Sequence, residues 1–211
     1  MTPKMKFYEN QAESIIRNLK KRNMEGYYCP TREEAVAKAL SFIQEGSLVS
    51  FGGSMTLSES GMMDALKTGN FQLIDRALAK NPEELKDCYR RSFLADTYVM
   101  STNAITMDGK LVNIDGNGNR AAALIYGPEQ VLILCGMNKV CKDEAAAISR
   151  AHETAAPMNA LRLSMDTPCA KTGSCADCLS KDCICAHTVI TRYNRMPGRI
   201  KVILVGEALG Y

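Results

Sequence analysis

Short apolar runs alternate with helical segments along this chain, and that alternation limits its fold more than any other feature. Runs that predict buried strands lie at 26–29, 48–51, 97–100, 131–134 and 200–205. Most are apolar on both sides of the extended chain, and strands of that kind favour a parallel sheet covered by helices on both faces. At 211 residues, the chain fits one domain of ordinary size, 1–211.

The segments between these runs carry helix signals. Apolar residues at positions 8, 12, 15 and 19 predict one face of a first helix. Thr31 with Glu34 forms a capping-box signature, and Asn81-Pro82 opens a later helix with a cap residue and a proline at the first position. We expect an α/β fold.

Charge and hydropathy exclude two classes of partner. The net charge is +3 and no five like charges run together, so no nucleic-acid footprint is indicated. No apolar stretch approaches the roughly 18 residues that a membrane helix needs, so we expect no membrane insertion. The N-terminus has no apolar leader, which favours the cytoplasm. The oligomeric state stays open, a homo-oligomer included.

Five cysteines fall within seventeen residues near the C-terminus, in the pattern C-x5-C-x2-C-x4-C-x-C at 169–185. Thiolates gathered by one short loop hold a tetrahedral zinc ion or an iron–sulfur cluster. Disulfides are uncommon in a reducing cytosol, although redox-active or free thiols remain the alternative. His187, beside the loop, is able to replace one thiolate ligand. The cysteine-rich loop 167–187 reads as an insertion within the domain.

A glycine-rich loop follows the second predicted strand. Gly52, Gly53, Ser54 and Thr56 come where that strand ends and a helix begins, and free N–H groups at such a place suit an anion. The loop is neither G-x-G-x-x-G nor a phosphate-binding Walker loop. The structural alternative is that the glycines only turn the chain, while Thr56 and Glu59 form a capping box.

A second polar loop precedes the apolar segment 121–125. Asp115, Asn117, Asn119 and Arg120 lie within six residues around two glycines. A capped helix start needs only one such residue, and an arginine there opposes the helix dipole. Arginine grips a carboxylate or phosphate in a bidentate manner, so we favour a ligand role for this turn. The preceding Asp108-Gly109 predicts a hairpin turn between two β-like runs.

These motifs resemble the LUD-domain family of lactate-utilisation proteins. The resemblance covers nearly the whole chain. The motifs that carry it are Gly-Gly-Ser-Met-Thr-Leu at 52–57, Ser-Thr-Asn-Ala-Ile-Thr at 101–106, Asn-Ile-Asp-Gly-Asn-Gly-Asn-Arg at 113–120, Tyr-Gly-Pro at 126–128, Asn138-Lys139, Thr-Pro-Cys at 167–169 and Val-Gly-Glu-Ala-Leu-Gly-Tyr at 205–211.

The resemblance implies a Rossmann-like three-layer α/β/α sheet of the ribose-phosphate isomerase, glucosamine-phosphate deaminase and CoA-transferase type. It implies ligand contacts at the glycine loop and at the Asn/Asp-rich turn, to which Asn103, Asn138 and Lys139 are added. It also implies that four cysteines, Cys169, Cys175, Cys178 and Cys185, hold a [4Fe–4S] cluster or zinc. Cys183 is then a bystander.

The function that the resemblance implies is a subunit or accessory of lactate oxidation to pyruvate. Such a protein binds a small anionic ligand and works beside iron–sulfur protein partners. Two alternatives remain open: a stand-alone enzyme on a phosphosugar or an acyl-CoA, and a non-catalytic metal-stabilised ligand sensor. Asp115 and Glu59 are the candidate catalytic carboxylates, and neither has a partnered histidine in the sequence.

Overall fold

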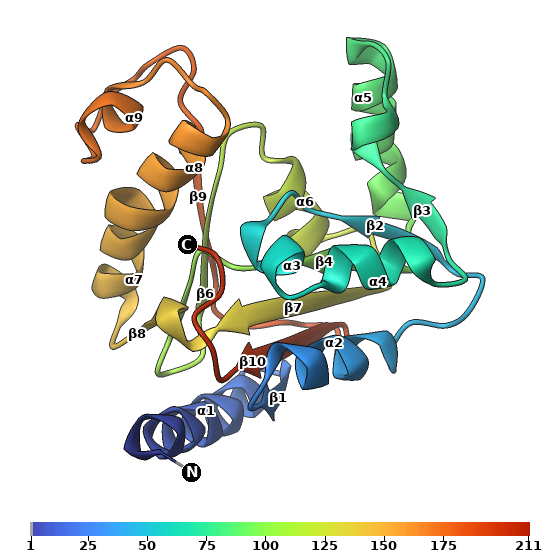
Figure 1. Ribbon diagram of the computed structural model, residues 1–211, viewed down its shortest axis with the longest axis vertical. Coiled ribbons are helices and arrows are strands. Elements are labelled where there is room, and N and C mark those ends of the chain that lie inside the picture. The colour runs from blue at the N-terminus through green and yellow to red at the C-terminus, as the bar shows by residue number, and fades with distance from the viewer. Residues whose placement is uncertain (1) are drawn as a thin grey trace.

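The computed structural model describes residues 2–211 and contains a six-stranded parallel sheet (Figure 1). Its strands run in the order β1-β10-β7-β4-β2-β3. Their bounds are β1 (Glu25–Cys29), β2 (Leu48–Phe51), β3 (Gln72–Ile74), β4 (Thr97–Met100), β7 (Gln130–Gly136) and β10 (Ile200–Val205). Every pairing in this sheet is parallel. The parallel sheet expected from the apolar runs is confirmed.

Helices cover both faces of the large sheet. Alternate residues of β7 enter opposite cores, because side chains along a strand point to alternate faces: Val131 belongs to one cluster and Leu132 to the other. The first core is closed by α1 (Pro3–Lys21) and α6 (Asn119–Ile125). The second is closed by α2 (Arg32–Leu40), α3 (Met55–Glu59) and α4 (Met62–Thr68). The result is the three-layer α/β/α arrangement.

A second, smaller sheet was not expected in full. It has four strands in the order β8-β5-β6-β9, with the bounds β5 (Ala104–Thr106), β6 (Leu111–Asp115), β8 (Val140–Cys141) and β9 (His187–Thr191). The predicted Asp108-Gly109 turn joins β5 to β6: Gly109 has φ 84° and its N–H donates to the Thr106 carbonyl at 2.9 Å. No sequence pattern predicted β9, which emerges directly from the cysteine-rich loop.

A long helical segment packs on the small sheet. It consists of α7 (Glu144–Arg150), a π-helical turn (Ala151–Ala155) and α8 (Ala156–Arg162). Its small residues at 147, 151 and 156 meet Ala104, Val112 and Ile114 in a third core. The remaining elements are α5 (Pro82–Arg91), α9 (Pro168–Thr172) and the short 3-10 turns η1 (Arg76–Leu78), η2 (Ser92–Leu94) and η3 (Met137–Lys139).

The predicted helix starts form as the side chains require. Thr31 Oγ1 accepts from the Glu34 N–H at 3.3 Å, and Asn81 Oδ1 accepts from the N–H groups of Glu83 and Glu84 at 3.1 and 2.9 Å. Among the described residues, no helix combines the length and apolarity needed to cross a bilayer.

Candidate functional site

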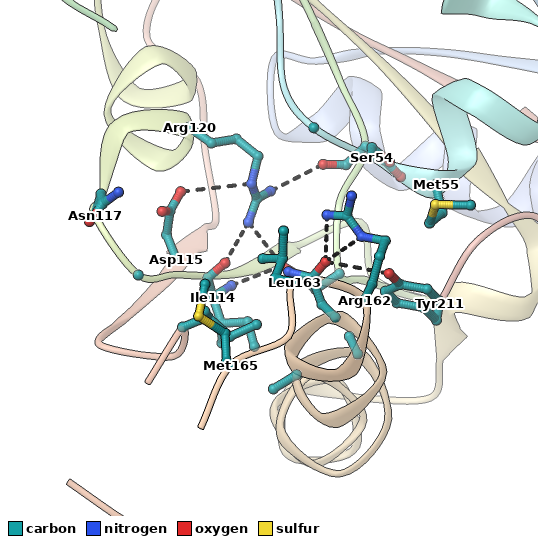
Figure 2. A pocket seen from close by; sticks show the side chains of 18 of the residues that line it. Ser54, Met55, Ile114, Asp115, Asn117, Arg120, Arg162, Leu163, Met165 and Tyr211 are labelled. Atoms are coloured by element: carbon teal, nitrogen blue, oxygen red, sulfur yellow. Dashed lines mark hydrogen bonds and ion pairs between the residues drawn. The ribbon is translucent and has the colours of Figure 1, made fainter. Parts of the chain in front are cut away.

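A cavity of about 470 Å³ lies where the carboxyl ends of β2, β4 and β7 face the small sheet. In parallel sheets, ligands settle at that edge. Segments far apart in the sequence line the cavity, and Figure 2 shows part of it from close by. Its cationic side chains outnumber its carboxylates: Arg76, Arg120, Lys139, Arg162 and Lys181 against Asp115 and Asp182. The cavity therefore favours an anion.

The glycine loop after β2 forms one wall of this cavity. Gly53, Ser54 and Thr56 line it, whereas Gly52 lies behind them. A Cβ at Gly52 would sit 3.3 Å from Cδ of Arg120, and one at Gly53 would collide with the Arg76 guanidinium. The glycines thus let two arginines lie close against the backbone.

Lys139 lies at the end of η3, directly after β7, and only 2% of its surface is exposed. Its Nζ donates to Thr56 Oγ1 at 2.7 Å and to Ser101 Oγ at 3.1 Å. No carboxylate lies within ion-pair distance of Lys139 in residues 2–211. Burial lowers the pKa of Lys139 to about 8, with Arg150 and Arg120 adding repulsion.

The alternative reading of Thr56 as half of a capping box is wrong. Ser54 occupies the N-cap position of α3 and makes no side-chain cap. The Thr56 hydroxyl instead donates to the Leu209 carbonyl at 3.1 Å and accepts from Lys139. It points into the site because the helix begins at Met55, two residues earlier than the capping box requires.

In the polar turn after β6, Asp115 acts as a cap. Its Oδ1 accepts from the Gly118 N–H and its Oδ2 from the Ala121 N–H, both at 3.0 Å. Arg120 Nε lies 3.7 Å from Asp115 Oδ2. Asp115 lines the cavity with a carboxylate whose hydrogen bonds organise the start of α6.

Arg120 is held entirely by the protein (Figure 2). One terminal nitrogen donates to the Ser101 carbonyl at 3.2 Å and to Asn113 Oδ1 at 2.5 Å. The other donates to Asn103 Oδ1 at 3.0 Å and to the Ile114 carbonyl at 2.5 Å. The other polar atom of this amide, Asn113 Nδ2, is the one buried side-chain nitrogen or oxygen in residues 2–211 without a hydrogen-bond partner. The guanidinium has no N–H pair left to grip a ligand in a bidentate manner, so Arg120 fixes the turn.

The other expected site residues divide into two groups. Asn103, Asn117 and Asn119 line the cavity. Asn138 does not: its Nδ2 donates to the Gly210 carbonyl at 3.0 Å and so anchors the segment after β10. Glu59 also lies outside the cavity and accepts from the Gly210 N–H at 2.6 Å. Of the two catalytic candidates, only Asp115 reaches the cavity.

The cysteine-rich loop forms another wall. Residues 181–184 line the cavity, and a Cβ at Gly116 would lie 3.2 Å from Cα of Ile184. Burial raises the pKa of Cys185, and the other loop thiols, Cys183 first, raise it further. Their donor chemistry fits zinc or an iron–sulfur cluster, but within residues 2–211 no three histidine, cysteine or acidic side chains are placed to hold a metal ion. The donors match in kind and not in position.

Several residues that line the cavity were not predicted from the sequence, among them Arg76, Arg162 and Tyr211. Asn159 Oδ1 accepts from Arg162 at 2.7 Å and from the Tyr211 hydroxyl at 3.4 Å. Figure 2 shows Arg162 and Tyr211 on the side of Ser54 and Met55, across from Asn117. Isolated basic residues in helical segments carry no sequence signal for a shared site.

Comparison with known proteins identifies a family and a fold. The model of the LUD domain matches residues 12–205. A DUF162 family protein from Deinococcus radiodurans has a similar structure, with a TM-score of 0.53 and 8% identity over 94% of this chain and 98% of that one. At this identity the likeness shows the fold alone. No curated protein matches the chain.

Two weaker likenesses are to translation initiation factors of Chaetomium thermophilum. The eIF2B beta structure gives a TM-score of 0.39 and 18% identity over 54% of this chain and 44% of that one. The tetrameric eIF2B-beta2-delta2 complex gives 0.42 and 14% over 82% and 55%. This chain spans about half the length of these factors.

Proposed function

This chain belongs to the LUD domain family, which is associated with lactate utilisation, and we propose that it binds a small carboxylate, lactate or pyruvate, in the cavity beside Lys139. It acts as an accessory subunit of lactate oxidation in the cytoplasm. The redox centres that accept electrons lie on iron–sulfur protein partners, because a lactate-oxidising site needs a cofactor to receive them. The sequence has no dinucleotide-binding glycine fingerprint.

One observation carries the proposal: Lys139 is a buried ammonium whose only hydrogen-bond partners within residues 2–211 are two hydroxyls. A buried charge is costly unless it is paired. The carboxylate of a ligand would supply the counter-ion that the protein does not. Arg76 and Arg162 on the cavity wall add positive charge that does not depend on pH near neutrality.

The experiment is calorimetric titration of lactate and pyruvate into the purified protein and into Lys139→Met. Loss of a charge-assisted contact costs ~1.5–3 kcal/mol, or roughly ten- to a hundredfold in affinity. Lys201→Met is the matched control, because Lys201 lies in a different hollow, with Gly198 and Glu129. Equal affinity of the Lys139→Met protein and the control would contradict the proposal.

Stability shows whether Lys139→Met is folded. The lowered pKa means that the cost of burying this charge is fully present below about pH 8 and disappears as the pH rises from there towards 10.5, the ordinary value. Lys139→Met should therefore raise the free energy of unfolding at neutral pH, by up to about 3 kcal/mol, and by less in alkali. Weaker binding by a more stable protein separates a lost contact from a lost fold.

The size of the cavity favours one second candidate, a larger anion such as a phosphosugar. A volume of about 470 Å³ falls within the roughly 300–1,000 Å³ of pockets for drug-sized ligands and exceeds what a three-carbon acid fills. Titration of ribose 5-phosphate beside pyruvate discriminates the two. Tighter binding of the sugar phosphate would favour a stand-alone enzyme over the subunit.

A further inference from the structure

The surroundings of Lys139 favour its neutral amine form more than is needed for a residue that only neutralises an anion. An anion-binding residue works best when it keeps its charge, yet burial and the neighbouring Arg120 and Arg150 make Lys139 easier to deprotonate than an ordinary lysine. A desolvated lysine beside other cations is the setting in which the amine becomes nucleophilic. Arg76 and Arg162, which cannot lose their charge, line the same cavity and are available to an anion there.

Two hydroxyls lie against this amine. Nζ contacts Thr56 Oγ1 at 2.7 Å and Ser101 Oγ at 3.1 Å, and the two hydroxyl oxygens are 3.3 Å apart. All three groups line the cavity, at the carboxyl ends of β2, β4 and β7. The Lys139 amine therefore lies beside two hydroxyls that can transfer protons, and it lines the cavity.

We propose that Lys139 captures a small anion that carries an aldehyde or ketone, and holds it as an imine. The inference rests on the proposed function, which brings an anion to this cavity. Two ligand sources share the required chemistry: a 2-oxo acid such as pyruvate, and the open-chain form of a sugar phosphate.

The step balances without an oxidant or reductant. The lone pair of neutral Nζ forms a bond to the carbonyl carbon, and the C=O π pair moves to oxygen. Nζ loses a proton and the oxygen gains one, which gives a carbinolamine. The remaining Nζ proton then passes to the hydroxyl, which leaves as water as the C=N bond forms. Thr56 and Ser101 are the groups placed to pass these protons.

The test traps the imine by reduction. The protein is incubated with pyruvate or with ribose 5-phosphate and cyanoborohydride at about pH 8, and peptide mass spectrometry measures the adduct at each lysine. At that pH, an amine of pKa about 8 has roughly a hundredfold more free base than a surface lysine. Labelling of Lys139 should therefore exceed that of any surface lysine by at least about tenfold.

Three controls make the trap specific. Lactate has no carbonyl and should give no adduct. Lys139→Arg keeps the charge but removes the amine, so it should give no adduct at position 139. The excess of Lys139 over surface labelling should also shrink as the pH rises from about 8 to 10, because surface amines then lose their protons too.

The outcomes separate this inference from the proposed function. An adduct with pyruvate alone assigns a 2-oxo acid, and one with ribose 5-phosphate alone assigns an open-chain sugar phosphate. Either supports the imine. If pyruvate binds in calorimetry but Lys139 is labelled no faster than surface lysines, the imine is overturned and the anion site stands. If neither binding nor labelling occurs, both proposals are overturned.

Discussion

At the scale of single residues, two cations of this cavity are satisfied in opposite ways. Arg120 donates its four terminal N–H groups to two oxygens of β6, to the Asn103 side chain and to the Ser101 carbonyl. In the described part of the chain, Lys139 donates only to the hydroxyls of Thr56 and Ser101. Arg120 therefore holds parts of the protein together. Lys139 has no carboxylate partner within residues 2–211 and is available to a ligand.

This contrast predicts different effects for two arginine variants. Arg120→Ala removes the guanidinium from four acceptor oxygens, of which Asn103 Oδ1 keeps the Ile114 N–H, and should lower the free energy of unfolding by about 3 kcal/mol or more. Arg162→Ala removes an exposed side chain that donates hydrogen bonds to Asn159 and lies beside Tyr211, so its unfolding free energy should change by no more than ~0.5 kcal/mol, while ligand affinity falls.

Urea denaturation measures the first effect and calorimetric titration the second. An Arg120→Ala protein of undiminished stability that has lost only affinity would restore Arg120 as the ligand clamp that the sequence predicts. Unchanged affinity in Arg162→Ala would remove helix α8 from the ligand site.

At the scale of elements, the glycines of the polar turn are explained by the cysteine-rich loop that lies against them. Asp115 of β6 pairs with His187 of β9 in an antiparallel register. Gly116 faces the backbone of Ile184, and a Cβ at Gly118 would lie 3.3 Å from the His187 ring. The loop is therefore part of the wall of the cavity, so a metal bound by its thiols would affect ligand binding.

The metal centre remains a prediction at this scale. We expect protein purified without oxygen to hold iron or zinc through Cys169, Cys175, Cys178 and Cys185, after the loop closes around it. Elemental analysis and a visible absorption spectrum distinguish the two metals. Cys175→Ser should lose most of the metal, whereas the matched Cys183→Ser should keep it. Less than about a tenth of an equivalent of both metals in the anaerobic wild-type protein would reject the prediction.

At the scale of the whole molecule, the parallel order of the sheet brings the site together. Because β2, β4 and β7 all run in one direction, their carboxyl ends deliver the glycine loop, Ser101 and Lys139 to one edge. The small sheet and α8 cover that edge from the other side and so enclose the cavity.

The subunit role predicts how the isolated protein behaves. Purified alone, it should show no lactate-dependent dye reduction, because its sequence has no dinucleotide-binding glycine fingerprint for a cofactor that would receive electrons from lactate. Activity should appear when iron–sulfur partner subunits are added, and Lys139→Met should reduce it in the reconstituted mixture while Lys201→Met does not. Robust lactate oxidation by the isolated chain would contradict the subunit role.

The strands of the large sheet other than β3 could be predicted from the sequence, because burial on both faces leaves runs of apolar residues; β3 has only three residues and no such run predicted it. The apolar runs at 48–51, 97–100 and 200–205 coincide with β2, β4 and β10. Helix caps are equally local, as at Thr31 and Asn81. The sequence also indicated the glycine loop and the polar turn as ligand loops, and the structure places both at one cavity.

Only the tertiary structure decided which side chains are free to act. In the sequence, Thr56 and Arg120 each fit two roles. The role of the Thr56 hydroxyl depends on Lys139, 83 positions away. The role of the Arg120 guanidinium depends on Asn113 and Asn103, 7 and 17 positions away. The contributions of Arg76 and Arg162 likewise follow from packing. A hydrogen bond is settled by which partners come within about 3 Å, and that is a property of the folded chain rather than of local sequence.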